Sequence, residues 1–374
     1  QLKKRFYKMN KKIFWCKKCL NMSTRNRIEF DSNGVCNACN WAQEKKTLDW
    51  NKREKELEVL LNRHKKKNSY DVIVPISGGK DGSYVTYQLK HKYGLNPLCV
   101  TITPPLAFDL GNQNLQNFIK SGYDTIQINP NYNVMQELNK RGFIQQGRPL
   151  YGWTIAIFTG VMKVANLHGI SLVMYGEDGE IEYGGSTESK NKPIFNAEFT
   201  KRVYLEGEVE TTLSGLNDQD LFFWKFSEED DLSKIELSHW SYFESWDPYR
   251  NYLVAKEHMG LKEKQDTNTG TFTNFAQTDN CLYDLHTYLM YLKFGFGRGT
   301  QDVGIDVRRG AMTRNQGKIL AQMYDSVSPE PYVELYLDYY EMKREQYDTI
   351  IDKWANKDLF AKKDGLWKPK FEIE

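Results

Sequence analysis

The apolar residues between positions 70 and 176 follow two alternating patterns. Short continuous apolar runs rich in β-branched residues predict strands that are buried on both faces. The segments between these runs carry apolar residues at helical spacing, which predicts helices packed on a sheet. The predicted strands are 71–76, 98–103, 125–128 and 170–175, and the predicted helices are 84–93, 111–120, 135–141 and 150–168. This alternation predicts an α/β fold with a doubly wound parallel sheet.

The pattern changes on both sides of this core. Residues 49–67 are amphipathic amid dense charge and predict a linking helix. Residues 185–245 are acidic with interleaved aromatic residues, which predict an insertion or lid packed by its aromatics; a ligand-binding role for those rings is the alternative. We predict five segments: a cysteine-bearing knuckle at 10–48, a linking helix at 49–69, the sheet core at 70–185, the insertion or lid at 186–246 and a mostly helical C-terminal region at 247–374.

The composition is that of a globular protein. Of 374 residues, 40% are hydrophobic and 14% are aromatic, which is ample for a core. The net charge of +2 makes no electrostatic case for nucleic acid, although the first 70 residues are rich in Lys and Arg. No apolar run is long enough to span a membrane, so we expect a cytoplasmic protein. The sequence starts at Gln1, and Met9 is a candidate native start.

The first predicted strand ends in Ser77-Gly-Gly-Lys-Asp-Gly-Ser83, directly before a helical pattern. Glycines let the backbone approach an oxyanion, and the free N–H groups and dipole of a helix N-terminus favour negative charge there. The spacing matches neither a Walker loop nor Gly-x-Gly-x-x-Gly. In a parallel sheet this loop shares one edge with residues 101–103 and 176–182. The sequence therefore predicts a nucleotide phosphate site at that edge, with an ordinary strand-to-helix turn as the structural alternative.

Four of the six cysteines form two Cys-x-x-Cys pairs near the N-terminus. Two such pairs at this separation fit a tetrahedral zinc site with four thiolate ligands. Because four thiolates leave no open coordination position, a structural role is predicted; a redox dithiol or disulfide pair is the alternative. The predicted ligands are Cys16, Cys19, Cys36 and Cys39.

A glycine-flanked aromatic segment, Lys293-Phe-Gly-Phe-Gly-Arg298, interrupts the helical pattern of the C-terminal region. It is followed by Arg308, Arg309 and Arg314. Because Arg binds planar anions in a bidentate manner, these cations predict a site for a diphosphate or a carboxylate. A helix–helix corner with solvated charges is the alternative.

The loop at 77–83 resembles the pyrophosphate loop of the ATP pyrophosphatases, the PP-loop superfamily with an adenine nucleotide alpha hydrolase-like fold, and departs from it by the inserted Gly82. Together with Cys16-Lys-Lys-Cys19, Tyr175-Gly-Glu-Asp-Gly-Glu180, Glu182-Tyr-Gly-Gly185 and the 293–298 segment, it makes nearly the whole chain similar to the bacterial N-acetyl sugar amidotransferases. This resemblance implies conversion of an acetamido group to an acetamidino group, with release of AMP and pyrophosphate. The implied substrate is an O-antigen, other surface-polysaccharide or flagellin sugar, including nonulosonic acids. A separate glutaminase and a cyclase-like subunit are implied as the source of ammonia.

The same resemblance implies roles for individual residues. Ser77 and the N–H groups of 78–83 would hold the pyrophosphate, with Lys80 facing it. Asp81 and Glu177 would order the loop or bind Mg²⁺, and with Lys80 they form the implied catalytic set. Thr101 and Ile102 would meet the adenine through backbone groups. The implied ATP-binding set is Ser77, Gly78, Gly79, Lys80, Asp81, Gly82, Ser83, Thr101, Ile102 and Gly176. The implied sugar-binding set is Glu180, Glu182, Tyr183, Lys293, Arg298, Arg308 and Arg309.

Two other function classes fit parts of the sequence. A tRNA-thiolating or other sulfur-transfer enzyme also joins this loop to zinc-bound cysteines, but it needs further cysteines near the adenylate. Cys99 lies in a predicted buried strand, and Cys281 has no Cys-x-x-Cys partner. A non-catalytic nucleotide-binding module is the second alternative. Neither cysteine sits on the glycine-flanked elbow of a glutaminase nucleophile, so we expect ammonia to come from a partner.

Overall fold

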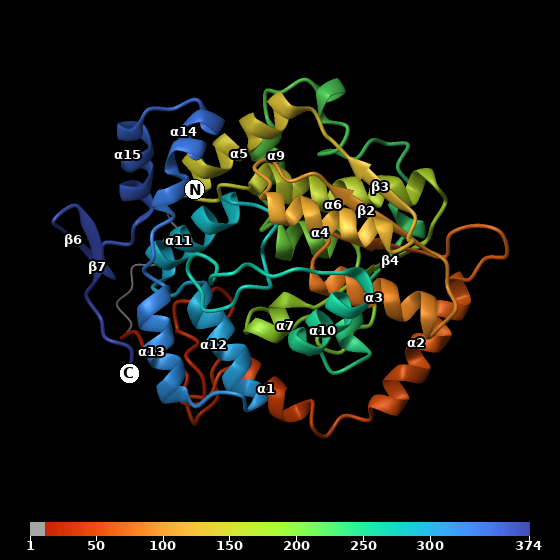
Figure 1. Ribbon diagram of the computed structural model, residues 1–374, viewed down its shortest axis with the longest axis horizontal. Helices are drawn as coiled ribbons and strands as arrows, with labels where there is room; N and C mark the ends of the chain where they lie inside the picture. Colours follow the sequence, from red (N-terminus) through yellow and green to blue (C-terminus); the bar gives the residue numbers. More distant parts are fainter. Residues whose placement is uncertain (1–11) are drawn as a thin grey trace.

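A five-stranded parallel sheet forms the centre of the computed structural model, which describes residues 12–374 and therefore not Met9 (Figure 1). The strand order is β3-β2-β1-β4-β5, and all neighbours are parallel. The strands are β1 Val72–Pro75, β2 Pro97–Ile102, β3 Thr125–Ile128, β4 Leu172–Tyr175 and β5 Glu236–His239. The order reverses between β1 and β4, so the loops after these two strands flank the position where doubly wound sheets bind ligands. The predicted α/β fold is confirmed.

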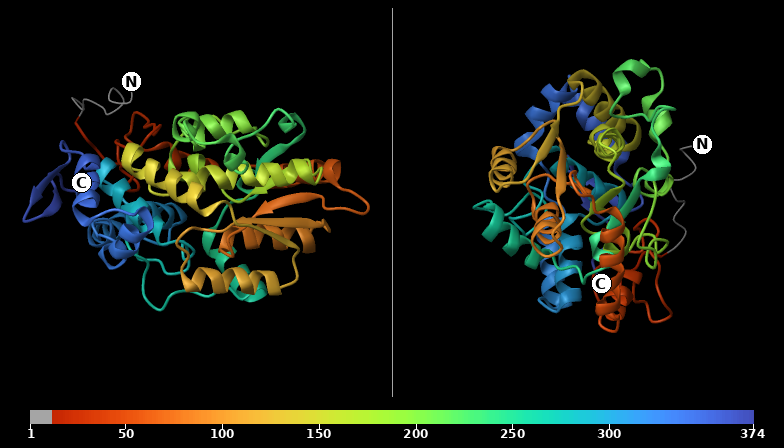
Figure 2. Two further views of the ribbon diagram at one scale, coloured as in Figure 1. Left: turned by 90° about the horizontal axis from the view of Figure 1, so that it is seen from above. Right: turned by 90° about the vertical axis from the view of Figure 1, so that its right-hand side faces the viewer.

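Helices cover both faces of the sheet (Figure 2). Successive side chains of β1 point to opposite faces of the sheet, and both faces are apolar. Val72 and Val74 pack into one apolar cluster, and Ile73 packs into the other. The first cluster includes residues of α2 Trp50–His64, α3 Lys80–His91, α4 Asp109–Lys120 and α10 Pro248–Met259. The second includes residues of α5 Tyr132–Gln146 and α6 Tyr151–Leu167. α3 starts earlier than the apolar pattern predicts, because its first turn consists of the polar residues that follow Gly79.

The fifth strand was not predicted, because Glu-Leu-Ser-His has no apolar run. It forms through pairing with β4, where Leu237 lies opposite Val173. The segment predicted as an insertion or lid thus contributes to the sheet. An ion pair between Lys163 and Asp230, at 2.7 Å and almost fully buried, attaches this segment to α6. Its helical pieces are α8 Ala197–Phe199, a π-helical turn Thr200–Tyr204, α9 Val209–Leu213 and 3₁₀ turns at Asp218–Leu221, Leu232–Lys234 and Trp240–Tyr242.

The N-terminal knuckle packs against C-terminal helices, so segments far apart in the sequence meet below the sheet in Figure 1. Its helix α1 Asn37–Glu44 contacts both α7 Gly179–Tyr183, which follows β4, and α12. The C-terminal elements are α11 Leu282–Phe294, α12 Arg298–Arg309, α13 Arg314–Tyr324, a 3₁₀ turn Glu330–Tyr332, α14 Val333–Tyr340, α15 Arg344–Trp354 and the hairpin β6 Phe360–Lys363 with β7 Leu366–Pro369. The hairpin was not predicted. No helix among residues 12–374 has the length and apolar character needed to span a bilayer.

Candidate functional site

The glycine loop, residues 77–83, joins the end of β1 to the first turn of α3. Gly78 has a left-handed backbone with φ of 80°, and a Cβ there would lie 2.4 Å from the backbone nitrogen of Leu115. A Cβ on Gly82 would lie 2.7 Å from the carbonyl oxygen of Pro75. Only glycine fits without a backbone shift at these two positions. Gly82, the residue that departs from the ATP pyrophosphatase pattern, therefore lets α3 start directly against β1.

No side chain caps the N-terminal end of α3. The helix begins at Lys80, and its N-cap Gly79 has no side chain to satisfy the free N–H groups of the first turn. The Ser83 hydroxyl is buried and has no hydrogen-bond partner in the described part of the chain. Free N–H groups, a helix dipole and an unpaired buried hydroxyl together suit an oxyanion.

Three charged side chains meet at this end of α3. Lys80 forms an ion pair with Asp81. Burial opposes the charge of Lys80, but the carboxylates of Asp81 and Glu177 outweigh burial and raise the pKa of Lys80. Burial, and then the negative charge of Asp81, raise the pKa of Glu177. The structure thus brings together the three predicted catalytic residues.

A residue that the sequence did not reveal holds Asp81 in place. Asn251 of α10 is completely buried, and its Nδ2 donates to Oδ1 of Asp81 at 3.1 Å. The Oδ1 of Asn251 accepts from Arg250, which pairs with Glu244 at 3.0 Å. Asp81 is therefore oriented by a helix 170 residues further along the chain.

A small pocket lies beside Lys80. Tyr183 of α7 lines it, and its hydroxyl donates to Oε1 of Glu177 at 3.3 Å. Arg298 lines it from α12 and pairs with Asp302 at 2.9 Å. The lining residues are Lys80, Tyr183, Pro248, Tyr249, Thr273, Phe275, Ala276, Arg298, Asp302, Ile305 and Asp306. A ligand phosphate bound at the glycine loop would therefore have a mixed aromatic and charged pocket next to it.

The second loop and the predicted adenine contacts lie at the same edge. A Cβ on Gly176 would lie 3.2 Å from the Cβ of Asp81, so the loop after β4 closely approaches the glycine loop. Thr101 is buried within β2. The carbonyl of Ile102 accepts a hydrogen bond from the indole N–H of Trp153 at 3.1 Å. The carbonyl of Ile102, which was predicted to meet the adenine, thus already accepts one hydrogen bond from the protein. Adenine binding here stays a prediction.

The other predicted sugar-binding residues on α7 contact the knuckle instead of the pocket. Glu180 pairs with Arg27 at 2.7 Å. Glu182 accepts from the indole N–H of Trp41 at 2.9 Å and pairs with Lys45 at 2.7 Å. These contacts attach α7 to the knuckle and account for both carboxylates without a substrate.

The four remaining predicted cations lie at different places. Arg308 donates to the carbonyl of Glu182 at 3.1 Å. Arg309 pairs with Asp247 at 3.6 Å, and its guanidinium lies 4.1 Å from the ring centre of Tyr249, at the rim of the pocket. Lys293 of α11 does not line the pocket. Arg314 donates to the carbonyls of Cys16 and Cys19 in the knuckle. Of the five predicted C-terminal cations, the structure places Arg298 in the pocket wall.

Some pocket residues were missed by sequence reasoning. Asp302 and Asp306 follow Arg298 at helical spacing, which is a readable signal that the three charges share one face of α12. Tyr249 and Asn251 lie in an ordinary amphipathic helix and carry no local signal. Their role follows from the packing of α10 against α3.

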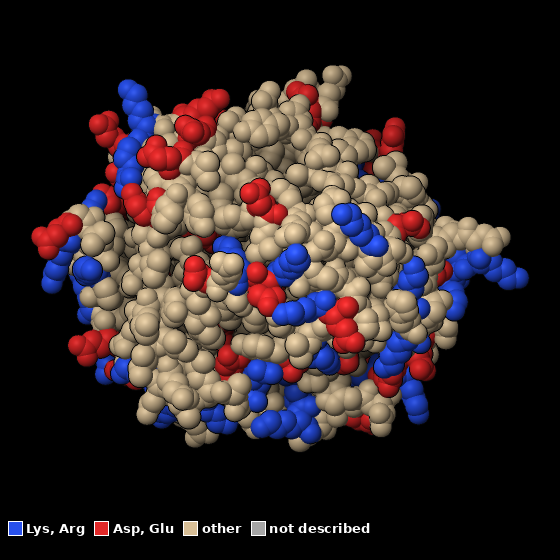
Figure 3. Space-filling model, in the orientation of Figure 1, with Lys and Arg blue, Asp and Glu red and all other residues tan. Residues whose placement is uncertain are grey.

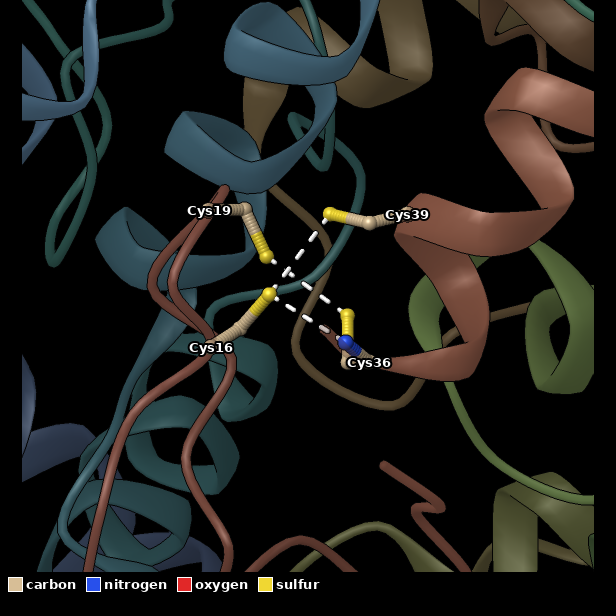
Figure 4. A group of neighbouring side chains, drawn as sticks. All are labelled: Cys16, Cys19, Cys36 and Cys39. Carbon is tan, nitrogen blue, oxygen red and sulfur yellow. Dashed lines mark hydrogen bonds between the residues drawn. The ribbon is translucent and has the colours of Figure 1, made fainter. Parts of the chain in front are cut away.

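The four cysteines of the knuckle form a buried cluster (Figure 4). Their Sγ atoms all lie within 4.8 Å of one another, with 3.8 Å between Cys16 and Cys39 and 3.7 Å between Cys19 and Cys36. A tetrahedral site with metal–sulfur bonds of about 2.3 Å has sulfur atoms about 3.8 Å apart, so the predicted metal site is confirmed by its donor set and geometry. Backbone N–H groups of Lys18, Asn21 and Cys36 point at these sulfurs, as is usual around bound thiolates.

The metal knuckle is joined directly to the segment that carries Tyr183. Nδ2 of Asn21 lies 3.4 Å from Sγ of Cys36 and donates to the carbonyl of Tyr183 at 3.0 Å. Asn37, next to a cysteine ligand, donates to the carbonyl of Gly185 at 2.8 Å. The knuckle therefore fixes the backbone of α7, although none of its described residues, 12–48, lines the pocket.

A known protein family matches the C-terminal part of this chain. Residues 269–372 match the family model described as LPS biosynthesis protein WbpG-like, C-terminal domain. The uncharacterized protein MJ1599 of Methanocaldococcus jannaschii is 29% identical over 175 residues, which cover 46% of this chain and 61% of that protein. The chain thus spans less than two thirds of this curated relative.

One solved structure gives a weaker likeness. The U34-tRNA thiolase NcsA from Methanococcus maripaludis, determined with its 4Fe–4S cluster, aligns with 80% of this chain and 86% of its own. The identity is 14% and the TM-score is 0.33, a level that supports no conclusion about function. The family match is confined to the C-terminal region: residues 269–372, which include α11 through the β6–β7 hairpin, are similar to the C-terminal domain of WbpG-like LPS biosynthesis proteins.

Proposed function

We propose that this protein is an ATP-dependent amidotransferase that converts an acetamido group of a bacterial surface-glycan sugar into an acetamidino group. The observation that carries the proposal is the glycine loop: a helix N-terminus without a side-chain cap, and a buried Ser83 hydroxyl with no partner among residues 12–374, beside a charged pocket. The match of residues 269–372 to an LPS biosynthesis family supports a sugar as the acceptor. The resemblance of the loop to the ATP pyrophosphatases supports cleavage between the α- and β-phosphates.

The chemistry follows from the poor reactivity of an amide. Attack of the acetamido oxygen on the α-phosphorus of ATP breaks the bond to the bridging oxygen, releases pyrophosphate and gives an O-adenylyl imidate. Ammonia then adds to the imidate carbon, a proton is lost, and AMP leaves as the amidine forms. No step needs a protein nucleophile, so catalysis consists of positioning and neutralising charge.

The residues at the glycine loop can position the phosphates and neutralise their charge. The first-turn N–H groups of α3 and the Ser83 hydroxyl would bind the pyrophosphate oxygens. Lys80 would neutralise part of their charge. Asp81 and Glu177 offer carboxylate oxygens, the ligands that Mg²⁺ prefers, and their closeness to each other suits a shared cation. Magnesium would neutralise the phosphates when bound.

We assign zinc to the four-cysteine site. Four buried sulfurs at tetrahedral separation, each with protein contacts and none open to the pocket, fit a structural zinc and not a catalytic one. The main effect of the metal would be to hold the knuckle, and through Asn21 the backbone of Tyr183, in place.

We propose that a partner supplies the ammonia. A glutaminase needs a reactive cysteine, and the two cysteines outside the knuckle do not qualify. Burial raises the pKa of both Cys99 and Cys281 to about 12, and both thiols are inaccessible. The same observation disfavours the sulfur-transfer alternative, because a sulfur carrier also needs an accessible thiolate.

The surface gives no support for a nucleic-acid substrate on the face drawn in Figure 3, where Lys and Arg alternate with Asp and Glu. A protein that tracks a phosphate backbone presents a continuous basic strip. Because Cys99 and Cys281 are buried, we do not carry tRNA thiolation forward as a second proposal.

The test is incubation of the chain with ATP, Mg²⁺, ammonium and a panel of N-acetylated sugars. We expect AMP, pyrophosphate and a sugar product about one mass unit lighter, since an oxygen becomes NH. Release of ADP and phosphate, or tRNA-dependent pyrophosphate release, would exclude the proposal. Replacing ammonium by glutamine should abolish amidine formation by the isolated chain; an equal rate with glutamine would show that no partner is needed.

A further inference from the structure

The pocket beside the glycine loop contains a carboxylate with one oxygen left without a donor. Asp306 of α12 lines this pocket and is only 6% exposed. Its Oδ2 accepts a hydrogen bond from the Tyr249 hydroxyl at 2.9 Å. Its Oδ1 is buried and has no hydrogen-bond partner among residues 12–374, because its ion pair with Arg309, at 3.8 Å, is too long for a hydrogen bond. A buried carboxylate oxygen without a donor is costly, so this oxygen indicates a position for a donor on a ligand.

The second carboxylate of the pocket wall has its oxygens occupied. Oδ1 of Asp302 pairs with Arg298 at 2.9 Å. Oδ2 of Asp302 accepts from the hydroxyls of Thr271 at 2.5 Å and Thr273 at 3.3 Å. Asp302 therefore holds the pocket wall together. Of the two carboxylates among the lining residues, Asp306 is the one that can accept a hydrogen bond from a ligand.

The other parts of the pocket match the parts of an acetamido group, which has a methyl, a carbonyl oxygen and an N–H donor. The rings of Tyr249 and Phe275 lie 5.2 Å apart between their centres and, with Ala276, offer apolar surface for the methyl. Lys80 lines the pocket from the first turn of α3, where the phosphates are proposed to bind. A phosphate oxygen would be repelled by Asp306, whereas an amide N–H can donate to its Oδ1.

We propose that Asp306 is a catalytic residue that accepts the proton of the acetamido N–H during adenylation. This proposal rests on the amidotransferase function proposed above, which places the acetamido group in this pocket. As the amide oxygen bonds to the α-phosphorus and the bond to pyrophosphate breaks, positive charge develops on the amide nitrogen. Transfer of the N–H proton to Oδ1 of Asp306 removes that charge and leaves a C=N bond.

The same residue returns the proton in the second step. When ammonia adds to the imidate carbon, the electron pair of the C=N bond moves to the nitrogen, which takes the proton back from Asp306. The added nitrogen then loses one proton to solvent, AMP leaves with its bonding electron pair, and the protonated amidine forms. Asp306 ends the cycle as a carboxylate, so the step consumes no further reactant.

The surroundings of Asp306 suit a group that takes up and returns a proton. Burial raises the pKa of Asp306, which makes it a better proton acceptor than a solvated carboxylate. The hydroxyl of Tyr249 fixes its orientation. Tyr249 and Asn251 both belong to α10, and they hold Asp306 and Asp81 respectively. One helix thus orients the carboxylate at the acetamido group and the carboxylate at the phosphates.

The first test compares the parent chain with Asp306→Asn and Asp306→Glu. The measured reaction is sugar-dependent pyrophosphate release from ATP with Mg²⁺ and ammonium, for a panel of N-acetylated sugars that includes UDP-N-acetylglucosamine and N-acetylneuraminate. Asp306→Asn should lower kcat by about 10²–10⁴-fold, the usual contribution of a general acid or base. The KM for ATP should stay nearly unchanged, and Asp306→Glu should restore part of the activity. Unchanged kcat in Asp306→Asn overturns the role of Asp306.

The second test removes the N–H from the sugar instead of the carboxylate from the protein. The probe is the N-methylacetamido analogue of the sugar that the parent uses best. The parent should adenylate this analogue at least about 10²-fold more slowly than the sugar itself. The difference between the two sugars should shrink in Asp306→Asn, because the group that takes the proton is gone. Equal rates in the parent, or the same difference in parent and variant, overturn the proposal. The comparison in the parent needs no variant, so it holds even if Asp306→Asn does not fold.

The matched control is Asp325→Asn. Asp325 is also a buried carboxylate that contacts α12, but it does not line the pocket. It accepts from the backbone N–H of Thr300 at 2.9 Å and from its hydroxyl at 2.5 Å. Asp325→Asn should lower the thermal unfolding midpoint and leave kcat close to that of the parent. If the parent forms no AMP with any sugar of the panel, the amidotransferase function itself is contradicted; an active parent with an equally active Asp306→Asn contradicts the role of Asp306 alone.

Discussion

Nδ2 of Asn251 in α10 donates a hydrogen bond to Oδ1 of Asp81 in the first turn of α3, at 3.1 Å. The other carboxylate oxygen of Asp81 pairs with Lys80. Because both oxygens are engaged and Asn251 is fully buried, the Asp81 carboxylate has one orientation. If Asp81 binds Mg²⁺ as proposed above, a residue that fixes its carboxylate in this way should tune the affinity of the metal.

Asn251→Leu should therefore raise the Mg²⁺ concentration needed for half-maximal activity by about 10–100-fold, the usual effect of losing an outer-shell partner. The measurement is pyrophosphate release as a function of Mg²⁺. Asn117→Ala is the matched control, since Asn117 also donates to the α10 end, at the carbonyl of Gly260, but far from Asp81. An identical Mg²⁺ curve for Asn251→Leu would show that Asn251 only packs the helices.

Ser83→Ala should lower activity by about 10²–10³-fold, the effect of losing one donor aimed at developing charge. Because the hydroxyl of Ser83 has no hydrogen-bond partner in the described residues 12–374, its removal should leave the free energy of unfolding unchanged or slightly higher. Activity and urea unfolding measured on the same preparation check both parts. The matched variant is Thr86→Val, one turn later, whose hydroxyl already donates to the carbonyl of Gly82. Thr86→Val should lower the free energy of unfolding and leave activity nearly unchanged. A Ser83→Ala variant with a lower free energy of unfolding and normal activity would contradict the assignment.

Asp284 of α11 should make stability depend on pH. Burial raises the pKa of Asp284 to about 6, and its Oδ2 has no partner among residues 12–374. Since the folded-state pKa lies above the unfolded value, stability is fully present below the unfolded pKa and is lost as pH rises through about 6. Asp284→Asn should thus stabilise the protein by up to roughly 3 kcal/mol above that pH, with no gain in acid. Urea unfolding at several pH values checks this, with the exposed Asp338→Asn as control; a gain that does not change with pH would contradict the assignment.

Loss of the knuckle metal should loosen α7 as well as the knuckle. Cys36→Ser removes a ligand and the sulfur beside the Asn21 amide, which also holds the carbonyl of Tyr183. Metal analysis should find one zinc per chain in the parent and less in the variant, because metal binding here is folding free energy. Limited proteolysis should then cut near residues 179–185 in Cys36→Ser and not in Cys99→Ala, whose thiol lies in β2. Active, fully folded protein without zinc would contradict a structural metal.

The sequence alone determined the elements that a short run of consecutive residues predicts. The β1 strand, the glycines that follow it and the four cysteines were all predicted at their observed places. In each case the physical cause is local. A run of β-branched residues forms a strand that is buried on both faces, and only glycine permits the close backbone approach at positions 78 and 82. The Cys-x-x-Cys spacing brings each pair of sulfurs to the distance that a metal needs.

The tertiary structure decided which charges meet. Arg298, Arg308 and Lys293 carry similar signals in the sequence, yet they lie at different places. Arg298 lies in the pocket wall, Arg308 contacts the backbone of α7, and Lys293 lies near Arg148. β5 is a strand only because β4 offers it hydrogen bonds, and Asn251 reaches Asp81 only because α10 packs on α3. These outcomes depend on how helices that are distant in sequence bury their apolar faces against one another. The packing of whole elements then decides which side chains come close in space. No short segment contains that information.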